Sequence, residues 1–354
     1  MAEGARAQQE WVPTGQGREQ LPPWLAPELD RLLTLYDQGR LHHALLLTGR
    51  TGLGKRLLAG VLARALLCQA TEGQPQRPCG TCRGCQLTAG GGHPDLRTLG
   101  PSSAGERGEI VVDSVRGLVE FLHLSAQRGG SRVAVIVPCD RLNRAAANSL
   151  LKTLEEPPAG VFLILATGRP GRLPPTVRSR CTVHRLAPPP WAMARQWLVE
   201  QGTGTDDPAR ADKALALAGG MPLSAWQVLQ EQGLEGYEAL LQQLHRLSAG
   251  GDPVKEAETW ERTPELLADA VAAILADLLR QGHGAPDRGL LPGTLAQQLV
   301  RSASLEALHH AFLRLGEHRR GLDQPLNGRL AAEAIFLDLA AALRPARQSA
   351  ARQA

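Results

Sequence analysis

The sequence predicts an α/β domain with a parallel sheet, followed by a region that is built of helices only. Apolar strand-like runs recur at 41–49, 95–99, 132–137, 161–167 and 181–186, with helical patterns between several of them. Strands that alternate with helices form parallel sheets covered on both faces. After the proline-rich linker at 187–191 only helical periodicities appear, and turns at 218–222, 248–253 and 281–289 interrupt them.

Length and composition bound the class of protein. A chain of 354 residues with 43% apolar residues is expected to form two or three globular domains. No apolar run approaches the roughly 18 residues that a membrane-spanning helix needs. The 39 Lys and Arg against 35 Asp and Glu leave a net charge of +4, which permits nucleic-acid contact but does not argue for it.

The first elements follow from the N-terminal sequence. Residues 1–22 contain no apolar signal core and are expected to be a disordered lead-in, so the predicted location is cytoplasmic. Residues 24–40 have the pattern of an amphipathic helix that ends near Gly39. The α/β domain is therefore predicted to span 23–187.

A phosphate-type loop follows the first strand. Residues 49–56, GRTGLGKR, match the G-x-x-x-x-G-K motif but carry Arg56 where Ser or Thr is expected. Gly49, Gly52 and Gly54 would let backbone N–H groups turn towards phosphate oxygens, and Lys55 and the helix N-terminus would add positive charge. The absent hydroxyl is the one that holds Mg²⁺ in P-loop enzymes. The alternative is a glycine-rich turn without a ligand.

A four-cysteine cluster begins at the end of the helix that follows the phosphate-type loop. Cys68, Cys79, Cys82 and Cys85 have the spacing of a tetrahedral zinc site. An iron–sulfur cluster is the rival interpretation, although its usual cysteine run has the fourth ligand downstream. No residue that could act as an acid or base accompanies the cysteines, so the predicted role of the zinc is structural and not catalytic. His93 is a weak alternative ligand and is better explained as a turn residue.

The stretch 148–181, NSLLKTLEEPPAGVFLILATGRPGRLPPTVRSRC, together with GRLHHALLLTG and the four-cysteine insert, resembles bacterial clamp-loader subunits of the AAA+ class. Within that class the chain is most similar to the delta-prime type of DNA polymerase III. The resemblance covers about 24–345. It implies a RecA-like AAA+ domain at 23–187 with a zinc module at 68–93, a small helical lid domain at 188–233, a helical collar at 234–345 and a tail at 346–354.

The resemblance also implies partners and a site residue. The expected assembly is a five-subunit ring with gamma/tau ATPase subunits and a delta subunit, which loads the sliding clamp onto primed DNA. Arg180, in the Ser-Arg-Cys motif, corresponds to an arginine finger that reaches the γ-phosphate on the adjacent subunit. Two alternatives remain: Arg180 forms an internal salt bridge near the sheet edge, or Arg178 is the finger.

Three parts of an ATPase are missing when the chain is compared with that family. Arg56 replaces the loop hydroxyl, Pro138 and Cys139 replace the acidic pair after the second strand, and Pro222 replaces the phosphate-sensing arginine of the lid. Asp140 lies one residue too far along and is expected to point elsewhere. The prediction is a non-hydrolysing ring subunit in which ATP or ADP binds weakly or not at all. The alternatives are a gamma/tau-like ATPase motor and a zinc-stabilised DNA-binding protein.

Two further segments have open interpretations. Glu155 and Glu156 could be paired catalytic carboxylates, but no partner acid or nucleophile accompanies them, so solvated or interface charges are favoured. The helix predicted at 326–343 has apolar residues at helical spacing and is either part of the collar or an ordinary core helix.

Overall fold

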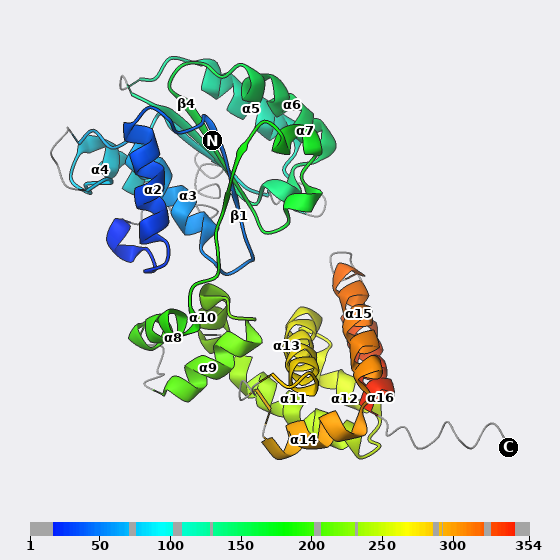
Figure 1. Ribbon diagram of the computed structural model, residues 1–354. Helices are drawn as coiled ribbons and strands as arrows, with labels where there is room; N and C mark the ends of the chain where they lie inside the picture. Colours follow the sequence, from blue (N-terminus) through cyan, green and yellow to red (C-terminus); the bar gives the residue numbers. More distant parts are fainter. Residues whose placement is uncertain are drawn as a thin grey trace. The chain divides into compact units, whose positions relative to one another are not determined.

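The computed structural model describes residues 17–70, 76–101, 108–127, 130–201, 207–230, 233–285, 290–291, 293–321 and 327–343. The chain divides into two compact units, residues 1–189 and 190–354 (Figure 1). The predicted tail at 346–354 and residues 1–16 of the predicted lead-in lie outside the described residues. The remainder of the lead-in is ordered: a short 3-10 helix, η1 (Arg18–Gln20), precedes the buried Leu21. The folded chain therefore begins before the predicted residue 23.

The first unit contains the predicted parallel sheet. Its strands are β1 (Ala44–Thr48), β2 (Leu96–Leu99), β3 (Arg132–Ile136), β4 (Val161–Thr167) and β5 (Thr182–Arg185), in the order β2-β3-β4-β1-β5. Every neighbouring pair is parallel, which confirms the α/β class. Because Thr48 is in register with Thr167, the carboxyl ends of β1 and β4 meet at the edge where ligands bind in folds of this type.

Helices cover both faces of this sheet (Figure 1). On one face lie α2 (Ala26–Asp37), α3 (Lys55–Leu66) and α4 (Arg83–Ala89), and on the other lie α5 (Val112–His123), α6 (Arg144–Glu155) and α7 (Pro175–Arg178). The short 3-10 helices η2 (Cys139–Arg141) and η3 (Pro170–Arg172) follow β3 and β4. The side chain of Asn143 caps α6 by accepting the N–H of Ala146, and Pro157 follows the helix end.

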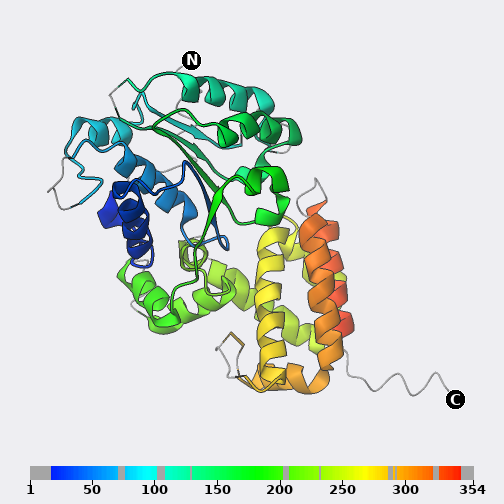
Figure 2. The same ribbon diagram turned by 45° about the horizontal axis from the view of Figure 1, so that its top comes forward.

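The second unit is helical throughout its described residues. Its elements are α8 (Trp191–Glu200), α9 (Pro208–Leu217), α10 (Pro222–Gln230), α11 (Gly233–Ser248), α12 (Pro253–Ala257), η4 (Glu258–Trp260), α13 (Pro264–Gly282), α14 (Gly293–Ser302), α15 (Leu305–Gly321) and α16 (Gly328–Leu343). The long helix α13, yellow in Figure 2, lies beside the orange helix α15.

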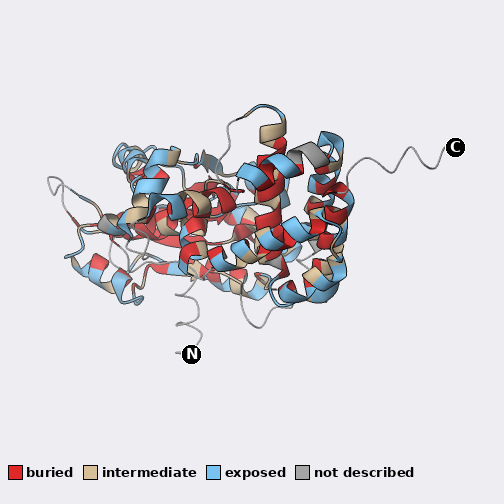
Figure 3. Cartoon of the chain, turned by 90° about the horizontal axis from the view of Figure 1, so that it is seen from below, coloured by how far each residue is buried: buried red, intermediate tan, exposed pale blue. Residues whose placement is uncertain are grey.

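One continuous apolar cluster, from Ala194 to Leu343, connects these helices, so the segments predicted as lid and collar share a core. Figure 3 shows buried residues along the faces on which helices pack and exposed residues on the outer faces. The finer division at residue 233 stays a prediction. Within the described part of the chain, no helix combines the length and the apolar character needed to cross a membrane.

Candidate functional site

The phosphate-type loop has the backbone that its glycines allow. It connects the end of β1 at Thr48 with the start of α3 at Lys55. Gly54 is the N-cap of α3 with φ of 92°, a left-handed conformation that side chains with a Cβ rarely adopt. At Gly49, φ is 145° and an added Cβ would lie 2.9 Å from the carbonyl oxygen of Leu186. The loop geometry therefore requires glycine at both positions.

Lys55 is turned onto its own loop. Its Nζ donates to the carbonyl oxygens of Gly49 at 2.8 Å and Arg50 at 2.7 Å, and the residue is only 9% exposed. Burial lowers the pKa of Lys55 to about 8, and the charge of Asp140 opposes this shift. The indole Nε1 of Trp24 donates a buried hydrogen bond to Leu53 O at 2.9 Å. The loop is therefore held by its own chain, and its lysine satisfies carbonyls of the loop itself.

The position of the missing acidic pair lies at the carboxyl end of β3. Cys139, in η2, is fully buried among apolar side chains, and this burial raises the pKa of its thiol well above the ordinary value. Asp140 accepts a hydrogen bond from Thr167 Oγ1 at the end of β4, and Thr167 Oγ1 in turn accepts the N–H of Arg169 at 2.8 Å. The sequence predicted that Asp140 would not take the place of the missing acidic pair. Its carboxylate is hydrogen-bonded to β4, and its negative charge opposes the lowering of the Lys55 pKa.

Pro222 occupies the lid position where a phosphate-sensing arginine would be expected, and this position is the start of a helix. Pro222 is the first residue of α10 and is buried. Gly219 and Gly220, with φ of 61° and 81°, form the turn that precedes it. Proline suits the first turn of a helix because it lacks an N–H group and its φ is already helical. The residue therefore has a structural role that an arginine would not perform.

The structure brings the four predicted cysteines together. The sulfur atoms of Cys68, Cys79, Cys82 and Cys85 all lie within 4.8 Å of one another, and Cys68 Sγ is 3.9 Å from Cys82 Sγ. A tetrahedral ion with zinc–sulfur bonds of about 2.3 Å would separate its ligands by about 3.8 Å. Cys82 is the N-cap of α4, and its sulfur accepts the N–H of Cys85 at 3.4 Å. The donor set therefore fits a four-coordinate metal ion.

The surroundings of the four sulfur atoms differ. Burial raises the pKa of Cys85 to about 12 and also raises the pKa of Cys68. Burial acts in the same direction on Cys79, but N–H groups of Cys82 and Thr81 and the Thr81 hydroxyl outweigh it and lower its pKa to about 6. A bound divalent cation keeps all its thiol ligands deprotonated. His93 is not in the cluster; its Nδ1 accepts the N–H of Asp95 at 3.1 Å in the turn before β2.

Arg180 forms an internal salt bridge, one of the two alternatives that the sequence left open. Its Nε donates to Glu155 Oε1 at 2.7 Å, its Nη2 pairs with the same oxygen, and its Nη1 donates to Thr176 O at 2.9 Å. Arg178, the last residue of α7, is exposed. The sequence did not identify Glu155 or Thr167 as partners, because only the packing of α6 on α7 and of β3 beside β4 brings them into contact.

Comparisons with known proteins identify relatives over most of the chain. A family model described as DNA polymerase III, delta subunit, matches residues 26–190. Over 265 residues the chain is 42% identical to the DNA polymerase III subunit delta-prime of Escherichia coli (strain K12), with 74% of this chain and 77% of that protein covered. The corresponding subunit of Yersinia pestis is 34% identical over 314 residues, which cover 85% of this chain and 89% of that protein.

A solved structure of a DNA polymerase III gamma subunit-related protein from Thermotoga maritima also aligns, with a TM-score of 0.42 and 19% identity over 89% of this chain and 100% of that one. The sequence relatives, which cover most of both chains, determine the family. The chain belongs to the DNA polymerase III delta-prime subunit family.

Proposed function

We propose that this chain is a non-hydrolysing subunit of the clamp loader of DNA polymerase III. It would join gamma/tau-type ATPase subunits and a delta subunit in a five-membered ring in the cytoplasm, and the ring would load the sliding clamp onto primed DNA. The chain would hold one structural zinc ion through Cys68, Cys79, Cys82 and Cys85. Family membership supports this proposal, because relatives named as delta-prime subunits match most of the chain.

The observation that carries the non-hydrolysing part is the fully buried Cys139 at the end of β3. A P-loop ATPase needs an acidic side chain there to hold Mg²⁺ beside the loop hydroxyl. Here a thiol faces the apolar core, the preceding residue is Pro138, and Arg56 replaces the hydroxyl. Without either Mg²⁺ ligand, the loop has no means to position the ion that neutralises charge on the transferring phosphoryl group.

The chemical contribution of the chain is then made to a neighbouring site. Arg180 carries a planar guanidinium whose positive charge can neutralise charge that develops on a γ-phosphate. Its side chain is 34% exposed on the segment that follows α7, so it is accessible to an adjacent subunit. An arginine finger supplied in trans is worth about 10³–10⁵ in rate at the site that it faces.

The test is Arg180→Ala in a ring reconstituted with the ATPase and delta subunits. We expect assembly and circular dichroism to be unchanged, while ATP hydrolysis coupled to clamp loading falls partially, because only one site in the ring faces this chain. Arg178→Ala tests the alternative finger: we expect it to keep the wild-type rate, and a loss of rate in this variant instead of in Arg180→Ala would assign the finger to Arg178. An assembled ring with an unchanged rate after Arg180→Ala would contradict the finger assignment.

The isolated protein should release no phosphate above background with Mg²⁺, clamp and primed DNA. Turnover that Lys55→Ala abolishes would instead support the gamma/tau-like motor.

A further inference from the structure

We propose that Glu155 restrains Arg180 in the free subunit, so that the arginine exchanges its own carboxylate for the neighbour's phosphate when the ring forms. This inference rests on the proposed role of Arg180 as a finger. It adds a positioning residue, on a different element, that governs when the guanidinium is available. The restraint lies entirely within the first unit and needs no other chain.

The guanidinium is engaged at each of its three nitrogen atoms. Nε and Nη2 face Glu155 Oε1, and Nη1 donates to Thr176 O at 2.9 Å. The edge formed by Nε and Nη2 is one that can bind a carboxylate or a phosphate through parallel hydrogen bonds. While Glu155 holds this edge, a phosphate oxygen cannot use it, because the two anions would compete for the same donors and repel each other.

The carboxylate is presented from a fixed position. Glu155 is the last residue of α6, and the preceding Leu154 is buried in the core. His43, directly before β1, has its Nε2 2.9 Å from the carbonyl oxygen of Leu154, so the end of α6 is tied to the start of β1. A salt bridge gains most when its partners are already held in place, because less side-chain entropy is lost.

The arginine side of the pair is fixed in the same way. Val177 of α7 is fully buried, and Cys181 Sγ donates to Val177 O at 3.3 Å. Arg180 therefore leaves a short segment that is anchored on both sides, and its side chain lies against α6. The two anchored backbones leave the guanidinium as the part that moves when the partner changes.

The strength of the pair suits a partner exchange. The side chains of Arg180 and Glu155 are 34% and 49% exposed, so water screens their attraction. Exposed pairs contribute about 0–1 kcal/mol, which corresponds to at most about a five-fold bias towards the restrained conformation. A triphosphate with its metal-bound charges on an adjacent subunit can overcome such a bias, whereas random motion in the free chain leaves the arginine mostly paired.

Glu156 provides a matched control. It follows Glu155 directly and is also exposed. Its side chain forms no hydrogen bond or ion pair with the described residues. Its backbone N–H donates to Lys152 O at the end of the helix. Glu156→Gln therefore changes the net charge of the chain and the charge near the end of α6 in the same way as Glu155→Gln, but it leaves Arg180 paired.

The first experiment measures the restraint in the isolated protein. Phenylglyoxal modifies accessible guanidinium groups, and mass spectrometry of the peptide that contains Arg180 gives its rate of modification. We expect Glu155→Gln and Glu155→Ala to raise this rate about two- to five-fold, and Glu156→Gln to leave it unchanged. Equal rates in all four proteins, with circular dichroism showing that each is folded, would overturn the proposal.

The second experiment follows the consequence in the reconstituted ring. Glu155→Gln should raise ATP hydrolysis in the absence of DNA, by a smaller factor than the modification rate because only one site in the ring faces this chain, and this increase should vanish in the background of Arg180→Ala. An increase that persists without Arg180 would show that Glu155 acts through another group and would overturn the proposal. If Arg180→Ala alone has no effect, the finger assignment fails, while the modification rates still decide whether Glu155 restrains Arg180.

Discussion

Lys55 is held by opposing effects at the scale of a single residue. The residue is largely buried, which disfavours the charge, yet two carbonyl oxygens at 2.7 and 2.8 Å accept hydrogen bonds from its ammonium and Asp140 supplies a nearby negative charge. The net result is a pKa lowered to about 8 from the ordinary 10.5. The folded protein therefore binds the Lys55 proton less tightly than the unfolded chain does.

This lowered pKa predicts a pH dependence. Between about pH 8 and pH 10.5 the unfolded chain retains the Lys55 proton that the folded protein has released, so stability rises with pH. The unfolding free energy of the wild type, minus that of Lys55→Met, should increase by up to about 3 kcal/mol across this window and stay constant below it. Urea unfolding of both proteins at a series of pH values measures the difference, and parallel curves would contradict the prediction.

Some residue-level features were predictable and others were not. The glycine positions and the absence of the loop hydroxyl follow from eight consecutive residues, 49–56, because a local motif encodes its own backbone. An internal salt bridge was one alternative for Arg180, but its partner Glu155 lies 25 positions away and becomes a neighbour only when α6 packs on α7. Glu155 was expected to be a solvated or interface charge, and no sequence pattern marks it as different from Glu156.

At the scale of elements, a buried ion pair fastens the strands at one edge of the sheet. Arg132, the first residue of β3, places its Nη2 3.1 Å from Asp95 Oδ1, directly before β2, and both residues are nearly inaccessible. Its Nη1 donates to Phe121 O at 2.6 Å, and its guanidinium carbon lies 4.5 Å from the centre of the Phe121 ring. The arginine thereby joins β3, the end of α5 and the turn before β2.

Arg132→Met should therefore be strongly destabilising. It removes the guanidinium that neutralises the buried Asp95 carboxylate, to which the N–H of Gln127 also donates at 2.9 Å. Breaking a buried pair in this way costs about 3–5 kcal/mol of unfolding free energy. Arg116→Met is the control, because its pair with Asp113 is exposed and should contribute about 0–1 kcal/mol. Similar urea midpoints for the two variants would show that the buried pair adds little.

The folding of the four-cysteine module is predicted to depend on a bound metal ion. We expect one zinc ion per chain by elemental analysis, and Cys82→Ser should lose it, because one of the four thiolates is removed while the serine hydroxyl can still cap α4. Since metal binding supplies folding free energy locally, amide exchange at 76–89 should accelerate in this variant. Cys181→Ser lies outside the cluster and should retain the metal. Iron in the purified wild type would contradict the zinc assignment.

The inner strands β1, β3 and β4 were predictable because each is an apolar run between turn or helix signals, and a parallel sheet buries both faces of its inner strands. The edge strands β2 and β5 contain polar residues and are partly exposed. The strand order was not predicted, since it depends on how the connections cross between neighbours. The start of the fold was placed too late, at residue 23, because the lead-in has no periodicity. Its ordered part is instead fixed by tertiary contacts: Leu21 is buried, and Arg18 pairs with Asp30 of α2.

At the scale of the whole molecule, the second unit has more apolar surface than its own core uses. Helix α16 buries Ile335, Phe336 and Leu339 in the shared core, yet Leu330 and Leu337 on its other side are 63% and 49% exposed. A helix that is apolar on all sides is usually buried on all sides. The sequence suggested the helix but could not separate its core face from its outer face, because both are apolar.

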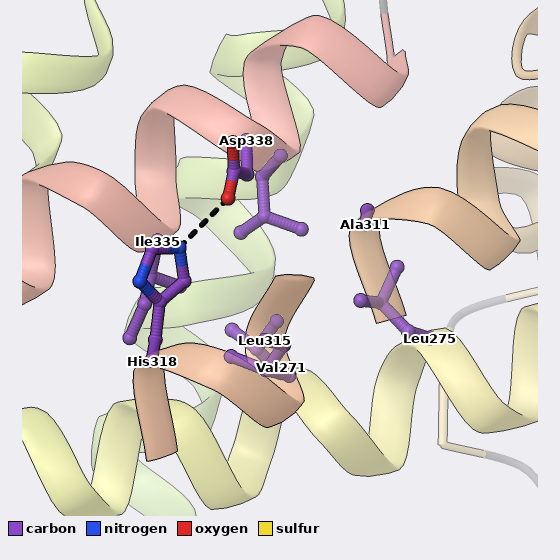
Figure 4. A pocket seen from close by; sticks show the side chains of 8 residues that line it. Val271, Leu275, Ala311, Leu315, His318, Ile335 and Asp338 are labelled. Atoms are coloured by element: carbon purple, nitrogen blue, oxygen red, sulfur yellow. Dashed lines mark hydrogen bonds and ion pairs between the residues drawn. The ribbon is translucent and has the colours of Figure 1, made fainter. Parts of the chain in front are cut away.

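A small hollow between α13, α15 and α16 does not offer a binding site on the inner side of α16. It has no room for a water molecule and is lined mainly by apolar side chains, among them Val271, Leu275 and Leu315 (Figure 4). His318 of α15 lies across it with its Nε2 2.7 Å from Asp338 Oδ2 of α16, and Arg314 Nε also contacts this carboxylate at 3.2 Å. These contacts join α15 to α16 and leave the outer face of α16 uncovered by the described residues.

The last prediction assigns this outer face to the assembly of the ring. Leu330→Glu combined with Leu337→Glu should leave the unfolding free energy within about 0.5 kcal/mol of the wild type, because both side chains are largely exposed in the isolated chain. Burying each leucine against a partner helix would contribute about 1.5–3 kcal/mol, so the double variant should bind the ATPase and delta subunits at least about a hundredfold more weakly. Mass photometry of the mixed subunits measures the assembled fraction. Leu124→Glu, in the first unit and 64% exposed, is the matched control and should assemble normally. Normal assembly of the double variant would show that α16 is an ordinary core helix with two incidental surface leucines, and the collar would then have to use another face.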